Sequence, residues 1–403
     1  IDPNVLSDIF ARNSGGILGM FNMFAGGALE RMTIFALNIM PYISASIIIQ
    51  LGQSVIPSLA ALKKEGEAGH RKITQMTRYL TVLITIVQGY GIAVGLQSMT
   101  GSAGISAVVN PGFVFIFTTV VSLVGGTMFI VWLGEQITSR GVGNGSSLII
   151  TVGIIANIPS ALAQTFELGR VGSMSLGVIA LLMIMVLLLI YVIVLVERAQ
   201  RKITIQYPKR QVGMRMTAAE SSHLPLKINP TGVIPPIFAS SLLLLPITIA
   251  NLSAENGPAW VQTLSQLLGH GQPLYLGLYA FLIAFFAFFY TAVVFNPEDT
   301  ADNLKKHGGF IAGIRPGKNT AEYLDYVITR LTVLGAFYLV ALCILPEILI
   351  SKLSVPFVLG GTTLLIVVQV TMDFVGQLQS HLIAYQYEGL IKKAALANKG
   401  KRR

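Results

Sequence analysis

Charged residues are scarce in this chain of 403 residues. Only 11% of them are Asp, Glu, Lys or Arg, whereas soluble domains carry roughly 25%. Hydrophobic residues make up 53%, so the composition predicts an all-α membrane protein that crosses the bilayer several times. Cysteine is scarcer still, because Cys343 is the only one, and this excludes an internal disulfide.

Residue clusters that carry metal or nucleotide chemistry are absent from the sequence. The five histidines are scattered and form no Cys/His cluster, so we expect no metal and no cofactor. No GxxxxGK[ST] phosphate-binding loop is present. An intramembrane protease would need paired aspartates in its spans or a His/Glu zinc spacing, and the sequence shows neither. We therefore expect a protein that is not an enzyme.

Nine stretches are apolar and long enough to cross a bilayer, for which about 20 residues are needed. None has an Asp, Glu, Lys or Arg in its middle, since Glu135, Glu347 and Asp373 stand at span ends. Ion-coupled transporters and pumps usually place such a residue there. An ion-coupled solute transporter is therefore the weaker alternative. The predicted spans are Met32–Pro57, Tyr79–Leu96, Phe113–Leu133, Ser146–Leu162, Met174–Val196, Thr231–Ala250, Leu274–Phe295, Leu331–Ile350 and Val355–Val375.

The first of these spans, Met32–Pro57, mixes isoleucines with amides and hydroxyls. A helix with lipid on one side and an openable, wet cavity on the other would use such residues. The stretch before it, Asp2–Glu30, contains five glycines within an apolar run. This pattern predicts a short, half-inserted helix with hinges, and an ordinary interfacial helix is the alternative.

Basic residues divide unevenly between the two sides of the nine spans. Of the 28 Lys and Arg residues, all but Arg12, Arg31, Arg170 and Lys352 fall on alternate loops and the tail. The positive-inside rule makes that side cytoplasmic, so we expect the start of this chain outside and its C-terminus inside. The abrupt start also suggests that upstream residues, and with them a span, are missing.

Two polar loops, at 197–230 with 34 residues and at 296–330 with 35, lie on the basic side. In the first, Ile203–Tyr207 alternates and Pro208–Gln211 could turn the chain back, which predicts a small hairpin. The basic residues could bind anionic lipid heads or the phosphates of ribosomal RNA. Orientation of the spans alone would also explain them.

Seven stretches, taken together and in order, resemble the SecY family, which forms the central pore subunit of the bacterial Sec protein translocase. Each stretch alone is moderately specific, and the similarity covers nearly the whole chain. The stretches are MFNMFAGGALERMTIFALNIMPYISASIIIQL (20–51), KKEGEAGHRKITQMTRY (63–79), MFIVWLGEQITSRGVGNGSSLII (128–150), VERAQRKITIQYPKRQ (196–211), HLPLKINPTGVIPPIFASS (223–241), FFYTAVVFNPEDTADNLKKHGGFIAGIRPG (288–317) and TLLIVVQVTMDFVGQLQ (363–379).

The resemblance implies a bundle of two pseudo-symmetric halves that open like a clam. The family has ten spans, so the nine spans here would be the second to the tenth, with the first absent. Inverted repeats of this kind are common in transport proteins. The implied parts are 1–30 (plug and outer loop), 31–170 (N-terminal half), 171–380 (C-terminal half with the loops 197–230 and 296–330) and 381–403 (basic cytoplasmic tail).

The family's pore ring of isoleucines is implied at six positions of this chain. An apolar collar can dewet and seal against ions, yet deform around a passing polypeptide. Two pairs are spaced i,i+4, so each pair shares a helix face. Without the resemblance these would be ordinary core or lipid-facing residues. The ring would consist of Ile39, Ile43, Ile150, Ile154, Ile237 and Ile366.

The resemblance implies three further sites. The stretch at about 6–26 would be a plug with hinges at Gly26 and Gly27. A lateral gate would lie between the spans Met32–Pro57 and Tyr79–Leu96 on one side and Thr231–Ala250 and Leu274–Phe295 on the other. Polar residues that pair this gate would be Ser44, Ser46, Ser240 and Ser241, and residues that dock a motor or ribosome would be Lys209, Arg210 and Arg315.

The resemblance also implies the function and the partners. The chain would translocate unfolded secretory polypeptides across the bacterial cytoplasmic (inner) membrane and release apolar segments sideways into lipid. Its implied partners are the SecE and SecG subunits, the SecA motor, the ribosome through rRNA phosphates, signal peptides, nascent chains and membrane lipids.

Overall fold

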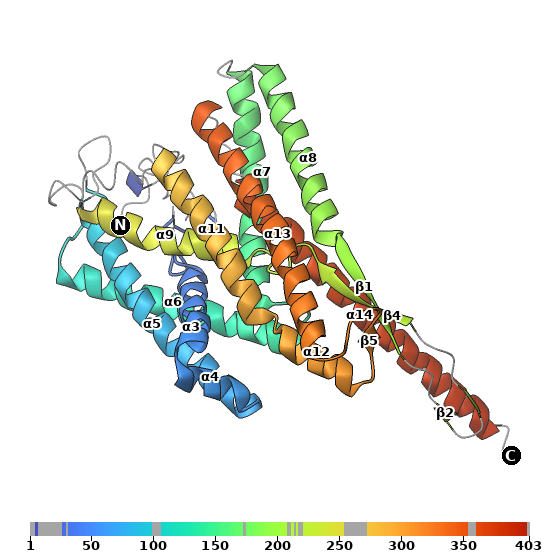
Figure 1. Cartoon of the computed structure of the whole chain (residues 1–403). Helices are drawn as coiled ribbons and strands as arrows, with labels where there is room; N and C mark the ends of the chain where they lie inside the picture. The colour runs from blue at the N-terminus through green and yellow to red at the C-terminus, as the bar shows by residue number, and fades with distance from the viewer. Residues whose placement is uncertain are drawn as a thin grey trace.

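Long helices dominate the structure, a computed structural model (Figure 1). It describes residues 5–6, 26–29, 31–98, 106–171, 175–207, 211–212, 215–216, 221–253, 272–353 and 360–400. Within these ranges seven helices are long and apolar enough to cross a membrane, which confirms the prediction of an all-α protein with many spans. They belong to α5 (Glu67–Ser98), α6 (Phe113–Arg140), α7 (Gly145–Arg170), α8 (Leu176–Arg198), α11 (Pro273–Val294), α13 (Lys318–Leu353) and α14 (Gly361–Gly400).

Two predicted spans correspond to shorter apolar helices. α3 (Met40–Val55) has 16 residues. α9 (Ile234–Ser253) contributes an apolar segment from Ile234 to Leu243. The count of nine spans therefore stays a prediction.

The expectation of one helix over Met32–Pro57 was wrong at its beginning. Residues 31–39 form turns, in which Asn38 has a positive φ of 47°. α3 begins only one residue before Pro41, because proline suits the first turn of a helix but not its interior. Packing holds the turns in place, since a Cβ added to Gly126 of α6 would overlap the carbonyl group of Ile34.

Proline has two other effects on the helices. Pro57 begins a separate short helix, α4 (Pro57–Lys64), after an extended residue at Ile56. Pro159 lies inside α7, and the helix nevertheless continues past it to Arg170. Membrane helices tolerate such a proline because neighbouring groups satisfy the freed carbonyl group.

The two polar loops join in one three-stranded sheet, in the order β4-β1-β5. β4 and β5 both pair antiparallel with β1. The predicted tight return of the chain after β1 was wrong, because β2 pairs with β3 in the same register as β1 with β4. The strand pairs β1–β4 and β2–β3, called the hairpin below, project from the bundle (Figure 1). The strands are β1 (Gln200–Gln206), β2 (Gln211–Val212), β3 (Arg215–Met216), β4 (Ser221–Lys227) and β5 (Phe310–Ile311).

A small apolar core fixes this sheet to the bundle. Ile203 of β1, Leu226 of β4 and Ile311 of β5 cluster with Leu324 and Val327 of α13. With 36 residues, α13 is about 54 Å long, well beyond the ~30 Å of hydrocarbon. Its first turns therefore reach out of the bilayer to carry the sheet, and α12 (Pro297–Lys306) packs against it as well.

One large hydrophobic cluster joins the early and late parts of the chain. Its buried members come from α3, α6, α7, α8, α9, α11, α13 and α14 or from the residues next to them. α3 contacts both α5 and α9, and α9 contacts α11. α14 contacts α7 and α8. The core therefore lies between helices that are far apart in the sequence.

Candidate functional site

All six isoleucines of the predicted pore ring lie in or against the large hydrophobic cluster. Four are buried members of it, at 4% exposure or less: Ile39, Ile150, Ile154 and Ile366. The other two, Ile43 and Ile237, are half-buried and pack against the cluster. They come from α3 and its N-terminal cap, α7, α9 and α14. The structure thus brings together residues that are up to 327 positions apart in the sequence.

A capped helix positions two of these isoleucines. The side chain of Asn144 accepts hydrogen bonds from the backbone N–H groups of Ser146 and Ser147, at 3.0 and 3.4 Å. Such an N-cap fixes where a helix begins. Ile150 and Ile154 follow on one buried face of α7, whereas Val152 on the same helix is 64% exposed.

The predicted hinge glycines form a turn against the same helix. Gly26 and Gly27 have φ of +67° and +80°, a region that favours glycine. A Cβ added to Gly26 would lie 3.3 Å from the Cα atom of Gly153. One added to Gly27 would lie 3.5 Å from the Oδ1 atom of Asn157. The turn therefore touches α7 beside Ile154, while nearly all of the predicted plug lies outside the described residues.

Three of the four predicted gate serines are buried, on α3 and α9, which contact each other. Ser44 donates a hydrogen bond to the carbonyl oxygen of Met40 in its own helix, and Ser240 donates to that of Ile237. The half-buried Ser46 accepts from Gln50. The Oγ atom of Ser241 is buried and has no hydrogen-bond partner among the described residues.

The predicted docking residues fall in different parts of the sheet region. Arg315 is exposed in the turn between β5 and α13. Its carbonyl oxygen accepts a hydrogen bond of 2.9 Å from Thr320, which ties this turn to the start of α13. Lys209 and Arg210 lie outside the described residues.

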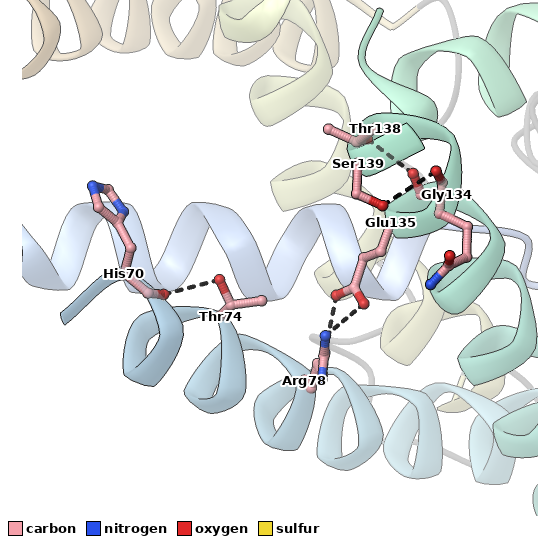
Figure 2. A network of polar contacts seen from close by, with 8 residues as sticks. His70, Thr74, Arg78, Gly134, Glu135, Thr138 and Ser139 are labelled. Atoms are coloured by element: carbon pink, nitrogen blue, oxygen red, sulfur yellow. Dashed lines mark hydrogen bonds and ion pairs between the residues drawn. The ribbon is translucent and has the colours of Figure 1, made fainter. Parts of the chain in front are cut away.

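An ion pair that the sequence did not predict joins the N-terminal half of α5 to the last turns of α6. Figure 2 shows Arg78 facing Glu135. The Nε atom of Arg78 donates to Oε1 of Glu135 at 2.9 Å, and the Nη2 atom of Arg78 donates to Oε2 of Glu135 at 2.6 Å. This bidentate geometry is the strong form of the arginine–carboxylate contact.

A buried polar network, also missed, lies where the sheet meets the bundle. The Nδ2 atom of Asn229 donates to Oε1 of Glu197 at 2.7 Å and to the carbonyl oxygen of Gly232 at 3.2 Å. Thr231 donates to Oδ1 of Asn229 at 3.0 Å. The three side chains are no more than 6% exposed. The run Asn-Pro-Thr-Gly at 229–232 is a turn signal that could have drawn attention to it.

Metal chemistry finds no support in the part of the chain that the structure describes. No group of three or more His, Cys, Asp or Glu side chains that could hold a metal ion occurs there. The features that stand out are an apolar cluster drawn from distant helices, a turn packed on it, and a polar sheet joined to one end of α13. Together they define a helical membrane protein whose core lies where its early and late helices meet.

Comparison with known sequences gives the family. A family model described as SecY matches residues 33–375. The protein translocase subunit SecY of Escherichia coli K12 is 55% identical over 402 residues, which cover 100% of this chain and 90% of that protein. The subunit of Rickettsia conorii is 54% identical over 398 residues, or 99% of this chain and 92% of the relative. The chain belongs to the SecY family.

Solved structures share the fold at low sequence identity. A structure described as a protein-conducting channel aligns with a TM-score of 0.66 and 17% identity, over 91% of this chain and 85% of that chain. Sec61 in a canine ribosome–channel complex aligns with a TM-score of 0.65 and 16% identity, over the same shares. The chain is accordingly a channel subunit of a protein translocase and a multi-pass inner-membrane protein. None of these comparisons supports the ion-coupled transporter.

Proposed function

We propose that the six isoleucines form the constriction through which unfolded secretory polypeptides cross the membrane. Their shared place in the large cluster, on both early and late helices, supports this role. A collar of branched, apolar side chains excludes water and ions when closed. It offers a passing polypeptide no hydrogen bonds or charges to bind, so the chain can slide through.

Crosslinking of a stalled secretory chain tests this constriction. Cysteines are introduced one at a time at positions 39, 43, 150, 154, 237 and 366, and each is expected to crosslink to the stalled chain. Matched controls lie on the same helices with exposed side chains, at Val152 and Ile155 of α7 and Ile48 of α3. Crosslinks at the control positions but not at the six would refute the constriction.

The seam between α3 and α9 is the proposed lateral gate, with α5 and α11 flanking it. α3 and α5 both contact α9, and α9 contacts α11. This surface is mainly apolar but contains the buried hydroxyls of Ser44, Ser240 and Ser241. Ser44 and Ser240 bond within their own helices rather than across the seam, so an apolar segment of a translocating chain could separate the helices and pass into lipid. The halves that move apart would be 31–170 and 171–380.

The turn at Gly26 and Gly27 is the proposed hinge of a plug that seals the outer side of the constriction. Its contact with Gly153 and Asn157 lies next to Ile154 of the proposed collar. Positive φ at both glycines lets the chain reverse direction at this point.

The sheet and the turn at Arg315 form the proposed docking surface on the cytoplasmic side. The distribution of Lys and Arg supports this orientation, with the C-terminus inside and the start of this chain outside. We propose that the SecA motor or a translating ribosome binds there, where basic side chains would meet acidic groups or rRNA phosphates. The energy for transport would come from that partner, with SecE and SecG completing the channel and no catalysis by this chain.

A further inference from the structure

The buried network around Asn229 stands between the proposed docking sheet and the proposed gate. Its acceptor, Glu197, lies in the last turn of α8, just before β1 begins. Asn229 itself follows the end of β4, and Thr231 precedes α9. At the base of the hairpin the backbone N–H of Ile228 donates to the carbonyl oxygen of Ala199 at 3.2 Å. Both strands thus begin or end within three residues of the network.

The network also touches the helix that carries the last collar isoleucine. Gly232 has φ of +63°, and a Cβ added there would overlap the amide of Gln369 on α14. Gln369 is 8% exposed and lies three residues after Ile366, or about 4.5 Å along the helix. On the other side, Gly335 of α13 approaches so closely that an added Cβ would lie 2.9 Å from the carbonyl oxygen of Ile228.

The free-energy cost of burying a carboxylate argues against a network that serves only to fill space in the core. Taking a carboxylate out of water is costly unless hydrogen bonds compensate for it, and an apolar replacement is often as stable. What such a group supplies is a defined geometry, because a displaced partner leaves a buried polar group unsatisfied. Asn229 therefore fixes the hairpin, the end of α8 and the start of α9 relative to one another.

We propose that Asn229, held by Glu197 and Thr231, is the positioning residue that transmits movement of the cytoplasmic hairpin to the gate helix α9. A tilt of the hairpin must shift Asn229, and the shift passes through the turn at Gly232 to Ile237, one turn into α9. Contact with Gln369 passes the same shift toward Ile366. The inference rests on the proposed docking at the sheet and gating at α9, and it adds the element that couples them.

The test uses the complete translocase reconstituted in vesicles, with a fluorescent pair on α3 and α9 that reports gate opening. Opening is driven either by purified SecA with ATP or by a free signal peptide, which acts directly on the seam between α3 and α9. The variants are Asn229→Ala, Thr231→Val and Glu197→Gln. The matched control is Thr332→Val, which removes a buried threonine hydroxyl that bonds Thr291 between α13 and α11.

We expect SecA-driven opening to slow about tenfold in Asn229→Ala and Thr231→Val, the scale of one lost buried hydrogen bond. Opening by signal peptide should stay within twofold of the wild type, a split that a merely structural defect would not produce. Glu197→Gln keeps an acceptor oxygen for Asn229 and should retain most of the SecA response. If Asn229→Ala does not fold, Thr231→Val carries the same comparison.

Two results would overturn the inference. In the first, the wild type, Thr332→Val and Thr231→Val all open equally fast with SecA, which rejects the coupling role but leaves the docking proposal intact. In the second, the wild type shows no opening with SecA although it opens with signal peptide, which rejects the docking proposal and the coupling together. Equal slowing with SecA and with signal peptide in Asn229→Ala and Thr231→Val would also reject coupling in favour of a general packing defect.

Discussion

The early part of the bundle (31–170) and the late part (171–380) each contain a carboxylate bonded to a nitrogen donor, but the surroundings of the two carboxylates are opposite. In the early part, Arg78 and Glu135 join α5 to α6 with side chains that are 47% and 25% exposed. In the late part, Asn229 and Glu197 join β4 to α8 and are 2% and 6% exposed. Both side chains of the first pair are charged and reach water, whereas in the second pair only the carboxylate can carry a charge and both side chains are buried.

This difference indicates which contact fixes the relative positions of the segments it joins and which contributes little to them. Exposed ion pairs are worth 0 to about 1 kcal/mol, because water and salt compete for both charges. A buried polar group that loses its hydrogen-bond partner costs about 1–3 kcal/mol, and more when the group is charged, because nothing replaces the lost hydrogen bond. The late part should therefore be rigid where the sheet joins it, and the early part adaptable where Arg78 meets Glu135.

Loss of the buried partner should have the largest effect. We expect Asn229→Leu to lower the free energy of unfolding by about 3 kcal/mol, since it leaves the Glu197 carboxylate buried without this donor. Unfolding of the purified protein by SDS titration in mixed micelles measures it. The double variant Glu197→Leu/Asn229→Leu removes both polar groups and should recover part of the loss. A double variant that is less stable than the single one would contradict this account.

Close helix approaches should come second and affect both parts alike. A Cβ at Gly126 would overlap the carbonyl group of Ile34, and one at Gly361 would overlap that of Leu342. We expect each Gly→Ala change to cost about 1–3 kcal/mol by overpacking, measured by the same titration. The matched controls are Gly125→Ala on α6 and Gly376→Ala on α14, where a Cβ meets open space. The controls should be neutral or slightly stabilising, since alanine favours a helix.

The exposed ion pair should contribute less than either. We expect Arg78→Gln to cost less than about 1 kcal/mol, and the cost should shrink as salt concentration rises. A double-mutant cycle with Glu135→Gln isolates the pair. A coupling energy as large as that of Asn229 with Glu197, and insensitive to salt, would remove the contrast between the two parts.

Charge reversal at the sheet should change stability least of all. Arg315 is exposed, so Arg315→Glu should alter the free energy of unfolding by no more than about 0.5 kcal/mol. Transport driven by SecA or the ribosome should nevertheless fall, because the proposed docking surface loses a positive charge. Lys318→Glu makes the same charge change three residues away, on the exposed first residue of α13. Normal transport by Arg315→Glu, or an equal loss in Lys318→Glu, would count against a specific role.

Most membrane helices could be predicted from the sequence, while the sheet could not. Long apolar runs such as the one in α8 leave little choice, because every backbone polar group in lipid must be bonded within the helix. β1 shows the opposite case. Its alternating residues predict a strand. Its partners, however, lie as far away in the sequence as β5, and a single sequence does not determine which strands pair.

The candidate site divides in the same way. The i,i+4 spacing of Ile150 and Ile154 already places them on one helix face, and the family resemblance selected them among many isoleucines. The network of Asn229 with Glu197 stayed hidden because 32 residues, including the whole hairpin, separate its members. The sequence placed Glu135 at the end of its span, but it did not indicate that Arg78, 57 residues earlier, would be its partner.

By itself, the sequence determined that this chain lies in a membrane and how most of its helices run. Both follow from composition and local patterns, since lipid penalises every unpaired polar group along a span. Its place among protein-conducting channels came from the resemblance of seven stretches to a known family. Only the tertiary structure decided that the residues before Pro41 form turns and which strands meet. It also decided that a carboxylate at the end of α8 is held by the amide of Asn229. Such pairings depend on how distant segments pack, because a buried polar group is satisfied by whatever the fold brings beside it.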